Sequence, residues 1–245
     1  MSLTLLTPSQ SLNKAYRKEK VGRAEIELFK KNLKEFITSI DRKESEEHVK
    51  NNVTKFLYDT YYNGKNQINT KGRIDLAIYE DKKPVVIIEA KRPSSSDMVT
   101  VKNLNAKAMQ ELILYYLRER IDEGNIDIKY LVATNMHEWF VFDANVFDKI
   151  FYKNNALTKD YVDWKGKRKA NDTTDFFYSD IAAPFLKNLK EEIILYLRNN
   201  VYVYIFASVR TVFLTVCNIL ASARDYKHFI SKVCTRKMRT FITSD

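Results

Sequence analysis

Two short apolar stretches, Ile74–Tyr79 and Val85–Lys91, flank a polar turn and predict a β-hairpin. Both faces of the second stretch begin with aliphatic residues, which is typical of an interior strand covered on both sides. Asp75 lies inside the first stretch, and Glu89 and Lys91 lie at the end of the second. Buried carboxylates are costly without a positive partner. Two acids and one lysine at the end of a hairpin therefore suggest that a metal ion supplies the missing charge.

Helical periodicity precedes this hairpin. Apolar residues recur at three- and four-residue intervals over Asn13–Ile40, after an irregular start at residues 1–12. Ser45 is a candidate N-cap for the next helix, in which Glu46 begins an apolar stripe. A glutamate in that position points toward the core, where it could add a carboxylate to the hairpin. The alternative is an ordinary acid at a helix start, favoured by the helix dipole.

Further elements predict the fold class. A short strand is expected at Gln67–Asn69, before the hairpin. After it, a long helix with a wide apolar face is expected over Val101–Glu123, closed by Gly124 in a left-handed conformation. Two strands follow, Lys129–Thr134 and Glu138–Asp143. The order helix, three strands, helix, two strands predicts an α/β fold with a mixed central sheet flanked by helices.

The C-terminal third is less regular. Residues 144–175 are polar and predict an irregular segment, with a basic run beside Trp164. The run consists of Lys165, Lys167, Arg168 and Lys169. It could grip a nucleic-acid strand or form a solvated loop. A helical pattern returns over Phe176–Arg198. Val201–Ala223 is almost continuously apolar, and we interpret it as a buried or partner-covered helix because Arg210 would be expensive inside a membrane.

Composition narrows the class of partner. The chain has 245 residues, 45% hydrophobic and 13% aromatic, as in a folded protein. Its formal charge of +10 favours a polyanion, either nucleic acid or an anionic membrane surface. The two cysteines form neither a disulfide framework nor a metal-ligand spacing. We recognise no signal peptide, so a cytoplasmic location is expected and a membrane location is not.

The charged hairpin suits phosphodiester hydrolysis. Mg²⁺ is usually held by one or two carboxylates together with waters and substrate phosphate, and Mn²⁺ is a possible substitute. Asp75 and Glu89 could bind such an ion from adjacent strands, and the carbonyl of Ala90 could be a further ligand. Lys91 would face the attacking water or the scissile phosphate. The alternative is a structural ion-pair cluster, which would leave a net negative charge in the core and would stabilise the fold poorly.

These residues resemble a known motif. Asp75, thirteen intervening residues and Glu89-Ala90-Lys91 are similar to the PD-(D/E)xK motif of restriction-endonuclease-like nucleases, with Ile74 in place of the proline. Several segments over roughly residues 10–190 resemble the N-terminal nuclease region of type IIG restriction enzymes and, more loosely, that of type I restriction motor subunits. The segments are SEEHVKNNVTKFLYDTYY, INTKGRIDLAIY, VIIEAKRP, NLNAKAMQELILYYLRER and LVATNMHEWFVFDA.

The resemblance implies a Mg²⁺-dependent DNA endonuclease, the cleavage part of a restriction-modification system. Asp75 and Glu89 would be metal ligands, Lys91 the catalytic lysine and Glu46 the helix glutamate. Gln110 stands where related nucleases often carry a glutamine that helps to position the site, although Leu114 rather than a tyrosine follows four residues later.

The resemblance also implies a division of the chain. Residues 1–44 would be an N-terminal helical segment packed on the core, 45–192 the nuclease core, and 193–245 an apolar-then-basic tail. Methyltransferase and target-recognition motifs are not found in the sequence, so we expect a truncated or frame-altered nuclease half. The expected partners are DNA and a separate methyltransferase or specificity polypeptide, and a homodimer is a further candidate assembly. Two alternatives stay open, namely a nuclease for branched or single-stranded nucleic acid and a catalytically idle DNA-binding or partner-binding remnant.

Overall fold

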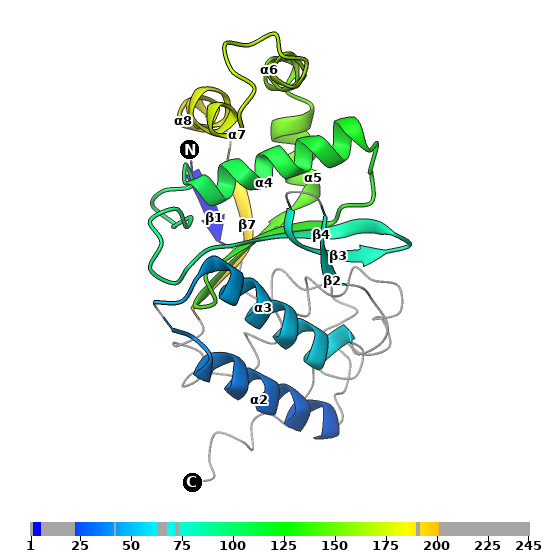
Figure 1. The fold of residues 1–245 in the computed structure, drawn as a ribbon, viewed down its shortest axis with the longest axis vertical. Helices are drawn as coiled ribbons and strands as arrows, with labels where there is room; N and C mark the ends of the chain where they lie inside the picture. The colour runs from blue at the N-terminus through cyan, green and yellow to red at the C-terminus, as the bar shows by residue number, and fades with distance from the viewer. Residues whose placement is uncertain are drawn as a thin grey trace.

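A mixed β-sheet lies at the centre of the computed structural model, with strands in the order β1-β7-β6-β5-β4-β3-β2 (Figure 1). The residues described are 2–5, 23–41, 43–62, 68–71, 74–189 and 192–200. The strands are β1 (Ser2–Leu5), β2 (Ile68–Lys71), β3 (Ile74–Glu80), β4 (Lys83–Ala90), β5 (Tyr130–Thr134), β6 (Glu138–Asp143) and β7 (Glu192–Asn200). The β4–β5 and β1–β7 pairs are parallel and the other four pairs are antiparallel. This confirms the predicted α/β class with a mixed sheet.

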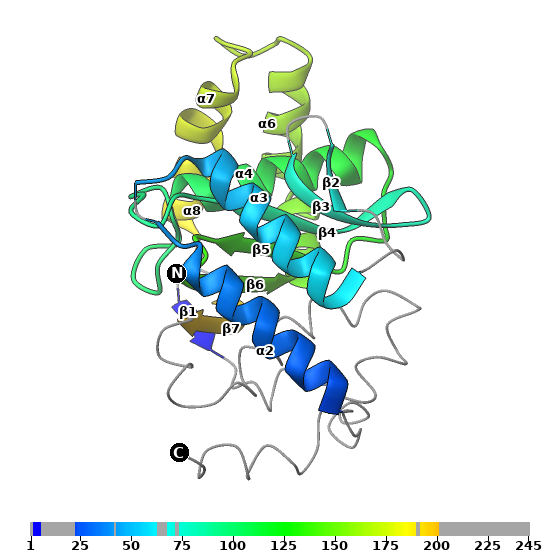
Figure 2. The same cartoon turned by 60° about the horizontal axis from the view of Figure 1, so that its bottom comes forward.

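Helices cover both faces of the sheet. The helices are α2 (Arg23–Thr38), α3 (Glu46–Leu57), α4 (Lys107–Leu117), α5 (Ala144–Phe147), α6 (Asn155–Lys165), α7 (Thr174–Phe176) and α8 (Ala183–Asn188). Four π-helical turns continue or join them: η2 (Tyr58–Tyr62), η3 (Arg118–Asp122), η4 (Asp148–Tyr152) and η5 (Phe177–Ala182). Helices α2 and α3 run side by side on one face, and α4 and the later helices cover the other (Figures 1 and 2).

Two apolar clusters result, one on each face of the sheet. The cluster under α2 and α3 includes Phe29, Phe36, Val49, Val53, Leu76, Ile78, Val86 and Ile88. The cluster under α4 and the later helices includes Ala77, Ile87, Leu112, Tyr116, Leu131, Ala133, Phe140 and Phe147. Along 76–78 of β3 and 86–88 of β4, neighbouring residues thus point into different clusters. The prediction that these strands are interior and covered on both sides is confirmed, and it explains why the carboxylates at their ends have little access to water.

The β3–β4 hairpin turns at Asp81 and Lys82, which have φ angles of 50° and 67°. Positive φ at both central residues is characteristic of a two-residue turn whose twist matches that of the paired strands. The register pairs Leu76 with Ile88. Because directly opposed residues of antiparallel strands point to the same face, the preceding Asp75 and the following Glu89 are directed to one side of the hairpin.

The N-terminal helices are confirmed, with bounds set by local capping. The Ser45 side chain accepts a hydrogen bond from the His48 N–H at 3.2 Å, which caps α3 as predicted. Gly124, with φ of 61°, ends the helical segment after α4. The Phe36 ring stacks on the Phe56 ring at 4.7 Å between centroids, which joins α2 to α3. The two helices pack together on the face of the hairpin that carries Leu76 and Ile88.

The structure corrects two predicted boundaries. Helix α4 begins at Lys107 rather than Val101, because Thr100 and Asn103 close a turn with two backbone hydrogen bonds and so take up the backbone groups that a helix would use. Residues 144–175 are not wholly irregular, since they contain α5 and α6. The inward-facing stripe of α6 is thin, with Leu157, Tyr161 and Trp164 as its buried residues, and the surrounding polar residues conceal it.

The largest correction concerns the two outer strands. Ser2–Leu5 forms β1, where an irregular start was expected, and Glu192–Asn200 forms β7, where helix was expected. A short aliphatic run such as Ile193–Leu197 is compatible with either element, and pairing with β6 and β1 decides for strand. The apolar stretch Val201–Ala223 and the first part of the predicted helix Asn13–Ile40 lie outside the described residues. Within the described part, no helix is long and apolar enough to cross a membrane.

Candidate active site

The end of β4 carries a buried lysine surrounded by acids, which we call the Lys91 cluster. It consists of Lys91, Lys50, Glu46, Asp75, Glu89 and Glu111. The Lys91 Nζ lies 2.5 Å from Glu89 Oε1, 2.7 Å from Glu111 Oε2 and 3.8 Å from Glu46 Oε2. Only 4% of the Lys91 side chain is exposed. The Lys91 backbone N–H donates to the Thr134 carbonyl at 2.8 Å, so β5 fixes the point from which this side chain leaves the sheet.

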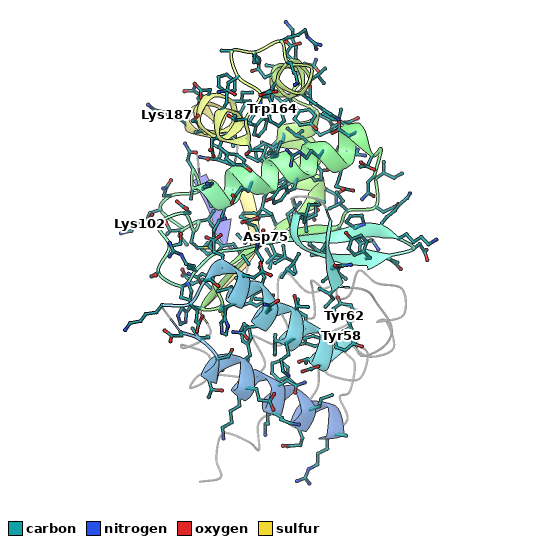
Figure 3. The ribbon with its side chains drawn as sticks, in the orientation of Figure 1. Tyr58, Tyr62, Asp75, Lys102, Trp164 and Lys187 are labelled. Atoms are coloured by element: carbon teal, nitrogen blue, oxygen red, sulfur yellow. The ribbon has the colours of Figure 1, made fainter. Side chains whose placement is uncertain are left out.

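Asp75 joins the cluster from β3. Its Oδ1 lies 2.7 Å from the Nζ of Lys50, and its Oδ2 accepts a hydrogen bond of 3.4 Å from the Ala90 N–H. Lys50 and Glu46 are one helical turn apart on α3, so this helix delivers both a cation and an acid to the strand ends. Figure 3 shows Asp75 near the centre of the molecule, between α3 and α4.

Acids outnumber cations in the cluster, where four carboxyl groups accompany two amines. Burial, followed by the nearby charge of Glu111, raises the pKa of Glu89 well above its ordinary value. Burial alone would lower the pKa of Lys91, but the carboxylates of Glu89 and Glu111 outweigh that effect and raise it. Lys91 therefore stays protonated at neutral pH. The excess of acid makes the cluster receptive to a further cation.

Glu89 also leaves one hydrogen-bond acceptor unused. Its Oε2 is buried and has no hydrogen-bond partner among the described residues. A buried carboxylate oxygen without a partner is costly, because the desolvation penalty of a charged group is not offset. Among the described residues, no group of three or more His, Cys, Asp or Glu side chains is placed to hold a metal ion by itself. The site fits a cation such as Mg²⁺, which accepts one or two carboxylates and completes its shell with water and phosphate.

Comparison with known proteins identifies a family. A family described as "Domain of unknown function (DUF7149)" matches residues 6–202. The chain belongs to this family. No curated protein and no solved structure matches the chain. The matched residues of this chain include every residue of the Lys91 cluster.

The remaining predicted site residues take different positions in this DUF7149 domain. Glu46 reaches the edge of the cluster, with 36% of its side chain exposed. Gln110 hydrogen-bonds outside the Lys91 cluster, since its Nε2 donates to Asn105 Oδ1 at 3.0 Å. Asn105 in turn donates to the Ala183 carbonyl at 2.9 Å. Gln110 thus braces the loop before α4 against α8, and the structure gives it no direct contact with Lys91.

Sequence reasoning missed Glu111, Lys50 and Tyr115. Glu111 lies one position after Gln110 and is buried on the apolar face of α4. Tyr115 follows one turn later, where burial and the carboxylates of Glu89, Glu111 and Asp75 raise the pKa of its phenol. An acid in the middle of an apolar helical stripe was the available signal for Glu111. Lys50 gave no such signal, because a lysine beside the apolar stripe of an amphipathic helix is typical of its solvated face.

The basic run of α6 and its following loop is neutralised internally. Lys165 contacts Asp122 at 2.5 Å, Lys167 contacts Asp172 at 3.1 Å, Arg168 contacts Asp163 at 2.8 Å and Lys169 contacts Asp160 at 2.6 Å. Trp164 is buried, and its Nε1 donates to the Thr173 carbonyl at 3.0 Å. The indole is therefore not available for stacking on a base, and each cation of the run already has an acidic partner. Of the two interpretations of this run, the geometry favours the solvated segment.

Proposed function

We propose that the protein is a metal-dependent endonuclease of the PD-(D/E)xK restriction type that hydrolyses DNA phosphodiester bonds. The observation that carries this proposal is the unbonded, buried Oε2 of Glu89, directed to the same side of the hairpin as Asp75 and beside a protonated Lys91. A structural ion-pair cluster would be expected to satisfy its acids. An excess of acid next to one held ammonium is instead what a cation-assisted reaction on a phosphate requires.

Asp75 and Glu89, with the carbonyl of Ala90, would hold Mg²⁺ or its substitute Mn²⁺. When bound, the ion supplies a Lewis acid for the phosphate oxygen and lowers the pKa of a bound water. Glu46 lies at the exposed edge of the cluster, where it would contribute an outer carboxylate. The Ala90 N–H donates to Asp75 Oδ2 at 3.4 Å, so the carboxylate of Asp75 is held against the backbone next to Glu89.

Lys91 acts as a hydrogen-bond donor and not as a base, because its ammonium is retained by two neighbouring carboxylates. An ammonium has three donors and no acceptor. It can hold the attacking water and stabilise the negative charge that builds on the phosphoryl oxygens. Removing one such preorganised donor typically lowers the rate by about 10²–10³-fold.

DNA would be held mainly through its phosphates. The chain carries a formal charge of +10, and Arg92, immediately after Lys91, is exposed and has no acidic partner among the described residues. Lys102 and Lys187 project from the same side of the molecule as one another (Figure 3). Contacts of this kind bind any sequence and weaken with added salt. Sequence choice within a restriction-modification system would come from a separate specificity or methyltransferase polypeptide.

The test compares the purified protein with its Lys91→Ala variant on supercoiled plasmid, in Mg²⁺, in Mn²⁺ and in chelator. We expect metal-dependent nicking that falls by about 10²–10³-fold in the variant. Lys83→Ala is the matched control, since Lys83 is an exposed lysine at the other end of β4. Equal nicking by wild type and Lys91→Ala would refute the site. Salt-sensitive binding without cleavage of duplex, branched or single-stranded DNA would indicate an idle binding module.

A further inference from the structure

Glu111 is a buried acid whose position only Lys91 explains. It lies in the second turn of α4, and about one tenth of its side chain is exposed. Its residue neighbours along the buried face of α4 are apolar, including Ala108 and Leu112. Among the described residues, Glu111 forms one ion pair, with Lys91 at 2.7 Å. Burying a carboxylate in apolar surroundings is expensive unless a charge partner is held close by.

The ammonium of Lys91 is shared between two helices and a strand. Glu89 on β4 and Glu111 on α4 are the near partners, at 2.5 Å and 2.7 Å, and Glu46 on α3 is more distant at 3.8 Å. Glu89 and Lys91 are two residues apart on the same segment, so their contact alone lets the lysine follow any local movement. Glu111 adds a fixed point from a helix on one face of the sheet.

We infer that Glu111 is a positioning residue, which holds the Lys91 ammonium in place when Glu89 is engaged by a cation. The inference rests on the proposed function, in which Glu89 is a metal ligand. A cation on Glu89 neutralises that carboxylate and repels the ammonium beside it. Glu46 is too distant and too exposed to replace the lost attraction. Glu111 is then the remaining near partner of Lys91.

The positioning role proposed for Glu111 differs both from that of a metal ligand and from that of a residue that only stabilises the fold. Among the described residues Glu111 makes no hydrogen bond with Asp75, whereas the Ala90 N–H links Asp75 to the segment that carries Glu89. A purely structural acid would affect the melting temperature, and its loss would leave the turnover of correctly folded protein unchanged. A positioning acid affects turnover at saturating DNA and saturating Mg²⁺, since Lys91 is needed in the chemical step.

The first test measures nicking by Glu111→Gln, Glu111→Asp and wild type. We expect Glu111→Gln to lower kcat by about 10–100-fold, as is typical for residues that orient an active-site group. KM for plasmid should change by less than about twofold, because ground-state binding is not involved. Glu111→Asp should recover part of kcat. Glu119→Gln is the matched control, since Glu119 is a buried acid two turns further on that accepts from Asn125 at 3.1 Å. Wild-type kcat in folded Glu111→Gln would overturn the inference.

The second test does not depend on activity. Crystal structures of wild type and Glu111→Gln with Ca²⁺ should show Lys91 Nζ still beside Glu111 in the wild type and withdrawn to another rotamer in the variant. An unchanged Lys91 in both would overturn the inference, and so would direct contact between Ca²⁺ and Glu111. An inactive wild type that binds no Ca²⁺ at Asp75 and Glu89 would instead refute the proposed function, and the inference with it. An active wild type with an active Glu111→Gln would refute the inference alone.

Discussion

Two groups of charged side chains lie toward opposite ends of the segment formed by α4 and η3, and they are built differently. In the Lys91 cluster, near the start of α4, acids exceed cations, and Glu89 Oε2 has no hydrogen bond with any described residue. At the other end, the Asp148 network places Arg120 Nη2 2.8 Å from Oδ1 and Lys153 Nζ 2.9 Å from Oδ2. Tyr116 adds a hydroxyl donor to Oδ1 at 3.4 Å.

The two groups show how a structural ion pair differs from a site. Asp148 has a partner for each oxygen, and its acid is outnumbered by cations at a place with partial access to water. Burial alone would raise the pKa of Asp148, but the hydrogen bonds from Lys153 and Arg120 outweigh it and lower the pKa. For Glu89 the balance is reversed, and burial raises the pKa. The paired oxygens of Asp148 are typical of a structural ion pair, and the unpaired oxygen of Glu89 is the reason we propose a further ligand at the Lys91 cluster.

Glu89→Gln should have the largest effect on function and should not destabilise the protein. Loss of the ligand should reduce nicking by more than about 100-fold, since residues that merely support metal ligands already contribute 10–100-fold. In chelator the melting temperature should equal or exceed that of the wild type, because the substitution leaves Lys91 and Glu111 as a one-to-one pair. Plasmid nicking tests the predicted loss of activity, and thermal unfolding of the same preparation tests the predicted melting temperature.

The pH dependence of this variant sharpens the comparison. A raised folded pKa means that the contribution of Glu89 to stability is complete below its ordinary value of 4.5 and is lost as pH rises through the folded pKa. Glu89→Gln cannot ionise at this position and does not lose that stability, so the melting temperature of the variant should exceed that of the wild type by more as the pH rises above 4.5. A variant that melts well below the wild type in chelator would show that Glu89 is a structural acid.

Asp148→Asn should have the opposite outcome, with stability reduced and cleavage retained. Removal of the charge weakens hydrogen bonds from Arg120 and Lys153, at a cost of about 2 kcal/mol in the free energy of unfolding. Because the folded pKa is lowered, this stability is present above the ordinary value of 3.8 and is lost as pH falls through the folded pKa. The difference between wild type and variant should therefore shrink in acid.

Denaturant unfolding at neutral and acid pH measures that difference. Asp127→Asn is the matched control, because its pair with Lys83 is about half exposed on both sides and should contribute less than about 1 kcal/mol. Loss of nicking in fully folded Asp148→Asn would mean that pairing of every carboxylate oxygen does not distinguish a structural ion pair from an active site.

Local pattern predicted the hairpin and its acids, because alternation along a strand fixes which residues share a face. It also predicted the cap at Ser45, which depends only on the next three residues. It failed for β7, where an aliphatic run fits a helix or a strand and partners distant in the chain decide. The sequence pointed to Gln110, but the neighbouring Glu111 is the residue of α4 that contacts the cluster. Only the packing of α4 on the sheet shows that Glu111 and Tyr115 face the cluster.

Lys50→Met should have the smallest effect and should tighten cation binding. The Lys50 Nζ lies 2.7 Å from Asp75 Oδ1, so this lysine would compete with the proposed cation for that oxygen. Removing a partly exposed pair of this kind is worth about 1 kcal/mol, or about fivefold in the half-saturating concentration of Mn²⁺. Lys55→Met is the matched control, since Lys55 lies on the same helix but pairs with Glu35 and Asp59. Calorimetric titration with Mn²⁺ decides the sign. Weaker binding would mean that Lys50 holds Asp75 in its ligand position, so that this pair, like the Asp148 network, is structural.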